Sequence, residues 1–415
     1  MLILFYRPSR VGESQKIHNE KEEINYTRFA IGSALFVLAL GAAVGLSFLF
    51  EYIFFDKSIE WIEKMQEKDS FFDVSLHIIG YGGESPGVIT TTFVLLAILP
   101  YSESVFLLFV VFISSYLSGF LKMLHHDARP YWVSDDVQAL MCNTSYANPS
   151  GHALYFAAFV PSLFYVGFYG KTNGLYSLYW NNFRNTTGFK VFYVAIIVLM
   201  VGIGFPSMFG RLYLGAHTLD QLIYGFMVGG LTFLYCCFVL RPPFMKYIVY
   251  FVEGRCTKKE AIINLLMIIA LIGFLFVINI IIYFINTTTF EDPLSWRQAL
   301  DQKCDISGVD IEDDHVFANK NMGYMFSPSS SPACLIGVIL YSWLSSHPIN
   351  RFHLLPVWKT IIRMVLNAIF MLPLAPLALI PSSAPNIVSW IFVEFLLTFS
   401  FSILAFSSNK YFLRK

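Results

Sequence analysis

The chain has 415 residues with 28 basic and 28 acidic side chains, so its formal net charge is zero. Only 13% of the residues are charged, whereas 56% are hydrophobic and 17% aromatic, and a soluble globular chain carries about 25% charged residues. This composition predicts an integral membrane protein. It excludes an intrinsically disordered chain, and the absence of a basic excess argues against binding to nucleic acid.

Long apolar stretches recur along the chain, and roughly 20 apolar residues in a helix cross the hydrocarbon core of a bilayer. Because no backbone group that faces lipid can stay unpaired, we expect an all-α, polytopic protein with about ten transmembrane helices. The expected spans are 29–55, 84–101, 104–123, 153–170, 189–209, 217–240, 260–285, 331–347, 357–380 and 385–408. The second and third are joined only by Tyr101-Ser102-Glu103, as a tight helical hairpin or as one re-entrant pair.

These spans divide the chain into three predicted regions: a cytoplasmic segment 1–28, a six-span core 29–241 and a four-span region 242–415. Residues 286–330 contain acidic residues and a Ser-rich run, so we expect a hydrophilic loop between the two groups of spans. Lys and Arg are more frequent on the side of the N-terminus, which predicts that both termini are cytosolic and that this loop is luminal or extracellular.

The predicted luminal or extracellular face contains two glycosylation sequons and three cysteines. The sequons are at Asn143 and Asn286, and we expect both to carry glycans. Cys142, Cys304 and Cys334 lie on or near this face, either as free thiols or with two of them joined in a disulfide.

Ionisable residues gather in three segments that share this face of the membrane, where such residues indicate function. The segments are 122–132 at the end of the third span, 148–152 at the start of the fourth, and 210–221 between the fifth and sixth. Each segment alone also fits an ordinary membrane-edge anchor or helix cap. Their order and shared face favour a site. We expect residues 125–127 (His-His-Asp) to face water outside it.

Three cations in these segments, Lys122, Arg129 and Arg211, suit the binding of a phosphate dianion. Arg offers such an anion a bidentate fork and Lys a point charge. Ser150 and Gly151 precede a helix, so their backbone N–H groups can point at the same anion. The sequence therefore predicts a phosphate-binding site.

Two histidines, His152 and His217, accompany the cations. One can attack phosphorus while the other protonates the departing oxygen, and the residue types alone do not assign the two roles. No Asp/Glu cluster with the spacing of metal ligands accompanies them. We therefore expect phosphoryl transfer without a metal or other cofactor.

At these residues the sequence resembles the phosphatidic-acid-phosphatase type 2 superfamily, which includes vanadium haloperoxidases and glucose-6-phosphatase. Within its membrane phosphatase branch the chain looks like glucose-6-phosphatases and also like sphingosine-phosphate phosphatases. The family's motifs Lys-x6-Arg-Pro, Pro-Ser-Gly-His and Ser-Arg-x5-His-x3-Asp align with 122–130, 149–152 and 210–221. The resemblance covers roughly 85–240 and implies a six-helix phosphatase core. It implies that His217 is the nucleophile, forming a phosphohistidine, and that His152 is the general acid. The residues that it implies for phosphate binding are Lys122, Arg129, Ser150, Gly151 and Arg211.

Two positions depart from the family pattern. Gly210 stands where the family usually has Ser, and Gln221 stands where it has the Asp that orients the nucleophile. Asp220 lies one residue earlier, and both offsets place a side chain on the His217 face of a helix. We expect Gln221 to hold the histidine tautomer, because glucose-6-phosphatases share it, with Asp220 as the alternative.

The resemblance predicts a membrane phosphomonoesterase of lipid metabolism, with its active site luminal or extracellular and the endoplasmic reticulum or another endomembrane as its location. A lipid phosphate, such as a sphingoid-base phosphate or phosphatidate, is the expected substrate, because its tail can stay in the bilayer. A sugar phosphate such as glucose 6-phosphate is the alternative, favoured by Arg129-Pro-Tyr-Trp132 and Gln221. A non-catalytic, phosphate-binding transporter is the alternative from another class. The expected partners are the phosphorylated lipid or sugar substrate and membrane lipids, and nucleic acid is not expected.

Overall fold

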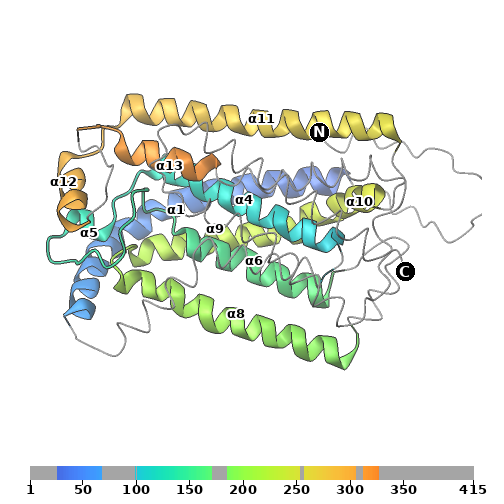
Figure 1. Cartoon of the computed structure of the whole chain (residues 1–415), viewed down its shortest axis with the longest axis horizontal. Coiled ribbons are helices and arrows are strands. Elements are labelled where there is room, and N and C mark those ends of the chain that lie inside the picture. Colours follow the sequence, from blue (N-terminus) through green and yellow to red (C-terminus); the bar gives the residue numbers. More distant parts are fainter. Residues whose placement is uncertain are drawn as a thin grey trace, which may run out of the picture.

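A computed structural model describes residues 26–67, 99, 101–170, 185–252, 257–304 and 312–326, and these residues are all-α (Figure 1). The elements are α1 (Tyr26–Gln66), α4 (Tyr101–His125), α5 (Pro130–Val133), α6 (Gly151–Phe168), α8 (Thr187–Tyr213), α9 (Leu219–Leu234), the π-helix η1 (Tyr235–Leu240), α10 (Arg241–Val252), α11 (Lys258–Thr289), α12 (Leu294–Lys303) and α13 (Val316–Phe326).

Among the described residues, six helical segments are long and apolar enough to cross a membrane, so the chain is an integral, multi-pass membrane protein. They are Tyr26–Gln66, Ser102–Val133, Gly151–Phe168, Thr187–Tyr213, Leu219–Ile248 and Lys259–Thr289. Six of the expected spans are thereby confirmed as candidate membrane helices. The expected spans 84–101, 331–347, 357–380 and 385–408 lie wholly or almost wholly outside the described residues and stay predictions.

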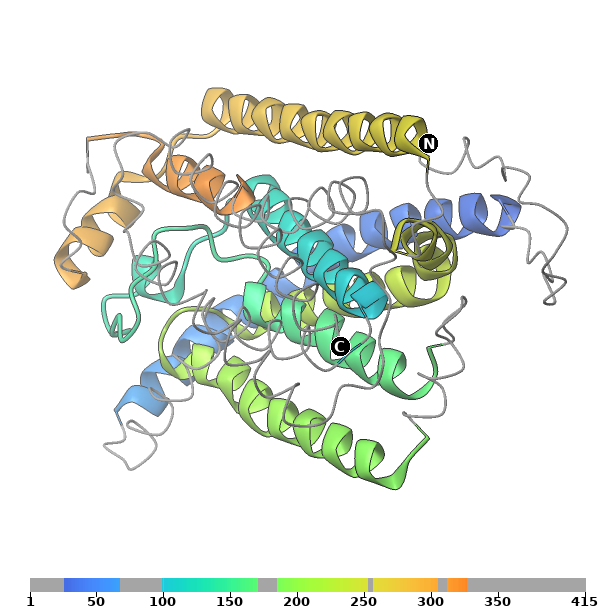
Figure 2. The ribbon, with the colours of Figure 1, turned by 45° about the vertical axis from the view of Figure 1, so that its right-hand side comes forward.

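The central pair of helices is α6 and α9, and α1 and α4 pack against it. Gly225 lets α6 and α9 approach closely, because a Cβ there would lie 2.6 Å from the Ser150 carbonyl oxygen and 3.1 Å from the Ala153 Cβ. Gly225 and Gly229 have the spacing of small residues at close helix crossings in membranes. Figures 1 and 2 both show α8 and α11 on opposite sides of this group.

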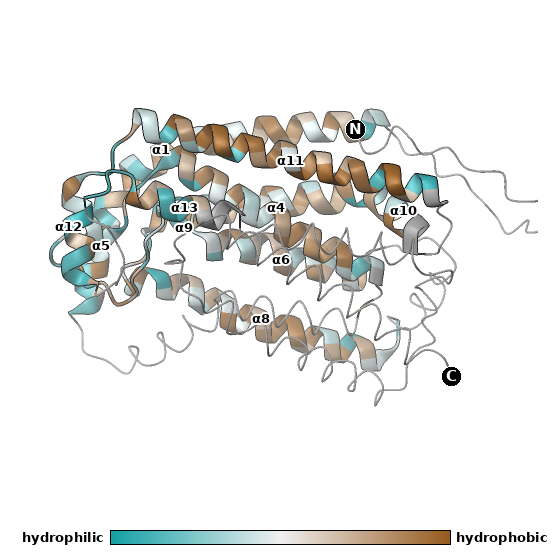
Figure 3. Cartoon of the chain, turned by 45° about the horizontal axis from the view of Figure 1, so that its top comes forward, coloured by the Kyte–Doolittle hydropathy of each residue, from teal (hydrophilic) through white to brown (hydrophobic). Residues whose placement is uncertain are grey.

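The outer helices present apolar side chains to their surroundings. Val198 on α8 is 62% exposed and Leu266 on α11 is 59% exposed. Figure 3 shows hydrophobic residues along the length of α11 and hydrophilic residues gathered around α12 and α5. This distribution matches helices that face lipid and an end of the bundle that faces water.

The segment 286–330, expected to be a hydrophilic loop, is not simply a loop. Its described part contains α12 and α13, which fold back onto the end of the bundle, α12 against α5 and α13 against α4 (Figure 1). A disulfide joins Cys142 to Cys304, whereas Cys334 lies outside the described residues. The acidic residues of this segment led to the prediction of a loop, although a few apolar residues pack these helices against the bundle. We refer to residues 286–304 and 312–326 together as the cap.

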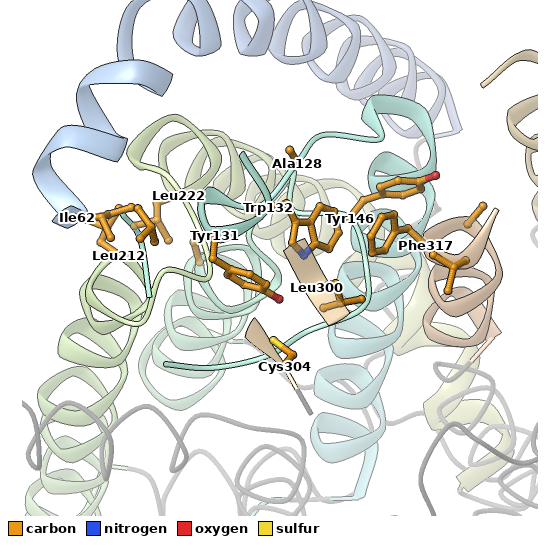
Figure 4. Packing of buried hydrophobic residues seen from close by; sticks show 14 of the residues in the cluster. Ile62, Ala128, Tyr131, Trp132, Tyr146, Leu212, Leu222, Leu300, Cys304 and Phe317 are labelled. Atoms are coloured by element: carbon orange, nitrogen blue, oxygen red, sulfur yellow. The ribbon is translucent and has the colours of Figure 1, made fainter. Parts of the chain in front are cut away.

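A hydrophobic cluster joins the cap to the bundle (Figure 4). Trp132 stacks on Phe317 of α13 at 3.9 Å between ring centroids and on Trp296 of α12 at 5.8 Å. The predicted domain boundary at residue 241 stays a prediction. In the chain, η1 and α10 follow α9 directly across it.

Candidate active site

The three motif segments lie on the ends of four helices. Lys122 is in the last turn of α4 and Arg211 in the last turn of α8, whereas His152 and Gln221 are in the first turns of α6 and α9. Two helix N-termini therefore contribute positive dipole ends to this region, which favours an anion.

A tight turn between α8 and α9 places His217 beside Arg211. Gly215 has φ +69°, a conformation that glycine adopts without strain, and a Cβ there would lie 2.8 Å from the Gln138 carbonyl oxygen. The N–H groups of Ala216 and His217 donate to the Arg211 carbonyl oxygen at 3.0 and 3.3 Å. The turn therefore sets the spacing between the cation and the histidine of the third motif.

Arg129 connects the first motif to the loops around it. Its guanidinium donates from Nε to the Ser145 carbonyl at 2.8 Å, from Nη2 to Ser145 Oγ at 3.0 Å, and from Nη1 to the Ala216 carbonyl at 2.7 Å. It also lies 5.9 Å from the centre of the Trp132 ring. The side chain is buried, so these contacts hold a cation inside the protein in one geometry.

The other two cations of the motifs are also buried. Lys122 Nζ donates to the Tyr146 carbonyl. Arg211 donates from Nη2 to Nε2 of His152 at 2.6 Å and from Nη1 to the sulfur of Met141. One cation of the predicted phosphate site is therefore in direct contact with the predicted general acid.

The backbone N–H of Ser150 does not point toward an anion as the sequence predicted. Its N–H donates to the Gln221 carbonyl at 3.0 Å and so does not point at an anion. Its hydroxyl is buried and has no hydrogen-bond partner in the described part of the chain, so that phosphate binding through the hydroxyl stays a prediction. At Gly151 a Cβ would lie 3.3 Å from Ser118 Oγ, a contact closer than most side chains accept.

Gln221 is the residue that faces the ring of His217. Its Nε2 donates to the Ala128 carbonyl at 3.0 Å, which leaves Oε1 to accept from the Thr218 N–H at 3.1 Å and from Nδ1 of His217 at 3.3 Å. Because Oε1 can only accept, Nδ1 of His217 carries the proton and Nε2 carries the lone pair. No hydrogen bond joins Asp220 to His217 among the residues that the structure describes.

The environment of His217 keeps its imidazole neutral. Burial lowers the pKa of His217 well below its usual range, and the positive charges of Arg129, Lys122 and Arg211 lower it further. The candidate site therefore combines an uncharged ring that keeps a lone pair on Nε2 with three buried basic side chains.

Residues 103–243, which contain all three motif segments, match the family model described as the PAP2 superfamily. This part of the chain is a PAP2 superfamily domain. The match does not identify a branch of the family, so the resemblance to glucose-6-phosphatases and to sphingosine-phosphate phosphatases stays a prediction. Comparisons with curated proteins and with solved structures found no match.

Three residues of the PAP2 domain that were expected to face water contact other side chains of the fold. His125 is 3% exposed, and its Nε2 lies 3.2 Å from the hydroxyl of Tyr224. His126 stacks on Phe290 with 4.0 Å between ring centroids, and Asp127 accepts from Nδ2 of Asn148 at 2.8 Å. The expectation was wrong for His125, because α1 and α9 cover it, whereas His126 and Asp127 remain partly exposed.

The two sequons differ in accessibility. Asn143 lies partly exposed in the loop before α6, and its glycosylation stays a prediction. Asn286 is 4% exposed within α11, and its Nδ2 donates to the Met123 carbonyl at 3.0 Å. The folded chain has no room for the glycan expected at Asn286, because the nitrogen that would carry it is buried against α4.

Two residues beside the PAP2 cations were missed from the sequence. Tyr146 supplies the carbonyl that Lys122 contacts, and Asp292 of the cap accepts from the Tyr146 hydroxyl at 2.7 Å. Neither belongs to a motif, and no periodicity connects positions so distant in the chain. The only signal in the sequence was the cluster of acidic residues in 286–330, and we interpreted it as a sign of a hydrophilic loop.

Proposed function

We propose that this protein is a metal-independent phosphomonoesterase of the membrane that hydrolyses a lipid phosphate through a phosphohistidine at His217. The arrangement at His217 carries the proposal. A neutral imidazole has its Nδ1 on the oxygen of Gln221, so that Nε2 keeps its lone pair. Proteins with a PAP2 domain are typically phosphatases, which supports the same reaction.

The reaction needs two steps, and the residues present supply both. In the first, His217 Nε2 forms a bond to phosphorus, the ester P–O bond breaks, and His152 gives a proton to the departing alkoxide. In the second, His152 takes a proton from water, the water oxygen bonds to phosphorus, and the P–N bond breaks to release inorganic phosphate. Lys122, Arg129 and Arg211 stabilise the charge on the phosphoryl oxygens throughout.

The contact between Arg211 and His152 connects substrate binding to this proton transfer. A guanidinium always donates, so Nε2 of His152 accepts from Arg211 when they are in contact. A phosphate oxygen is a stronger acceptor than an imidazole nitrogen. When the phosphate takes over the Arg211 N–H group, Nε2 of His152 becomes free to hold the proton that the leaving group needs.

The position of the site supports a lipid substrate. Its side chains lie on the terminal turns of candidate membrane helices. Such helices end near the membrane–water interface, which is also where the phosphate of a lipid lies. The disulfide between Cys142 and Cys304 at the same end supports a luminal or extracellular active site, because disulfides persist in oxidising compartments. The endoplasmic reticulum remains the location expected from the family.

Phosphate release tests the proposal. We expect the purified protein in detergent to release phosphate from sphingosine 1-phosphate or phosphatidate faster than from glucose 6-phosphate, with no loss in EDTA. A preference for glucose 6-phosphate would replace the lipid by a sugar, and inhibition by EDTA would contradict the metal-independent mechanism. Phosphate binding without release from any ester would favour the transporter.

Gln221 and Asp220 can be separated by kinetics. Gln221→Met preserves side-chain volume but removes the acceptor for His217 Nδ1, so kcat should fall on the order of 100-fold with little change in KM. Asp220→Asn is the matched control on the next residue, and its kcat should stay within about threefold of wild type, a difference below 1 kcal/mol. The reverse order of the two effects would assign the orienting role to Asp220.

A further inference from the structure

The Tyr146 peptide is where two cations of the proposed phosphate site converge. Lys122 Nζ donates to the Tyr146 carbonyl, and Nη2 of Arg129 lies 3.4 Å from the same oxygen. The preceding residue, Ser145, accepts two further hydrogen bonds from Arg129. The position of this peptide therefore sets where both cations can place their charge.

The cap holds Tyr146 in place from the other side. The Tyr146 side chain is fully buried, and its hydroxyl donates to Oδ1 of Asp292 at 2.7 Å. Asp292 is 2% exposed, and its Oδ2 accepts from the N–H of Phe317 at 2.8 Å. Its backbone N–H donates to the Asp314 carbonyl at 2.8 Å. Both carboxylate oxygens of Asp292 thus accept hydrogen bonds, one from Tyr146 in the loop before α6 and one from Phe317 in the cap.

The cap also contacts α4 next to Lys122. Asn286 donates to the Met123 carbonyl at 3.0 Å, and its Oδ1 lies 3.5 Å from the Tyr146 hydroxyl. Figure 4 shows Tyr146 beside Trp132 and Phe317, in the cluster that joins the cap to the first motif. The cap lies outside residues 103–243, so the family match does not account for these contacts.

We propose that Asp292, acting through Tyr146, is a positioning residue that holds Lys122 and Arg129 in the geometry that binds the substrate phosphate. The inference rests on the proposed function, because it assigns the cap a part in the same site. Asp292 touches neither the substrate nor the histidines. Its loss should therefore weaken phosphate binding and leave the chemical step intact.

The test compares variants of the full-length protein in detergent. Tyr146→Phe removes the donor, and Asp292→Ala removes the acceptor. Both should raise KM and the inhibition constant of inorganic phosphate roughly tenfold, with kcat within about twofold of wild type. Asp292→Asn should restore both constants. Its Oδ1 can accept from Phe317 while its Nδ2 donates to the Tyr146 hydroxyl, which then turns toward Asn286.

Lys303→Met is the matched control within the cap. Lys303 Nζ donates to the carbonyls of Ser134 and Val137 and has no contact with Tyr146. Its replacement should leave KM and phosphate inhibition unchanged. A purely structural role for Asp292 would lower thermal stability while KM and phosphate inhibition stay at wild-type values, and that result would overturn the inference. Equal weakening by Lys303→Met would also overturn it.

Protection of the protein by inorganic phosphate against thermal unfolding separates this inference from the proposed function. If phosphate protects the wild-type protein and Asp292→Ala weakens that protection, but no ester is hydrolysed, the proposed function fails and the inference holds. If phosphate protects neither protein and no ester is hydrolysed, both fail.

Discussion

Replacing His217 by alanine or asparagine should lower kcat on the order of 10⁴-fold, to the limit of detection. The reason is that, in the proposed mechanism, Nε2 of His217 forms the bond to phosphorus, and neither alanine nor asparagine has a nucleophilic ring nitrogen to replace it. Asparagine is the more informative change, since its Nδ2 can still donate to the oxygen of Gln221. We therefore expect His217→Asn to fold normally. A rapid quench at alkaline pH should trap labelled phosphate on the wild-type protein and none on this variant.

His126→Asn is the matched control for this experiment. His126 is a histidine within the first motif, has φ +41° and stacks on Phe290. Asn tolerates this backbone conformation better than most residues do. Turnover of His126→Asn should stay near the wild-type rate. If His217→Asn kept near-normal turnover, the nucleophile assignment would be wrong. If His126→Asn abolished turnover, the outcome would no longer be specific to His217.

The second large effect concerns stability at the other end of α4. Glu103 and Arg241 form an ion pair of 2.6 Å, and their side chains are 0% and 6% exposed. The guanidinium carbon of Arg241 lies 5.7 Å from the ring centroid of Phe106 and 5.7 Å from that of Tyr165. Glu103→Ala leaves a buried cation without its carboxylate, which should cost about 3–5 kcal/mol. Unfolding in mixed detergent micelles measures this loss.

Two controls make that measurement specific. The double variant Glu103→Leu with Arg241→Leu should regain most of the stability, because two apolar side chains replace two buried charges. Asp314→Ala removes the partner of Arg297 in a pair whose carboxylate is 57% exposed, and it should cost less than about 1 kcal/mol. A single variant at Glu103 as stable as wild type would contradict the expected contribution of the pair.

Activity distinguishes this pair from the site. Glu103 lies nineteen residues before Lys122 on the same helix, which is about 28 Å along its axis. The fraction of Glu103→Ala that remains folded should therefore turn over substrate at the wild-type rate. This ion pair was not predicted, because Tyr101-Ser102-Glu103 was interpreted as the link between two spans and is instead the first turn of α4.

The helices and the residues of the site followed from local patterns. Apolar runs of membrane-spanning length predicted the six candidate membrane helices, since the bilayer permits few other structures. The motif residues were recognisable because each motif is a short, continuous stretch with fixed spacing. The roles of Ser150 and of the pair at 220 and 221 were not determined in this way, because the direction of a side chain at a helix start depends on what packs against it.

Composition and motif spacing by themselves predicted an all-α membrane protein, as the described residues are, and the residues of its candidate phosphate site. Only the tertiary structure decided that Gln221 faces His217, that the Ser150 amide is already bonded, and that the cap reaches the cations through Tyr146. The physical reason is separation along the chain. Tyr146 and Asp292 are 146 residues apart, so their hydrogen bond arises from folding and leaves no periodic trace in the sequence.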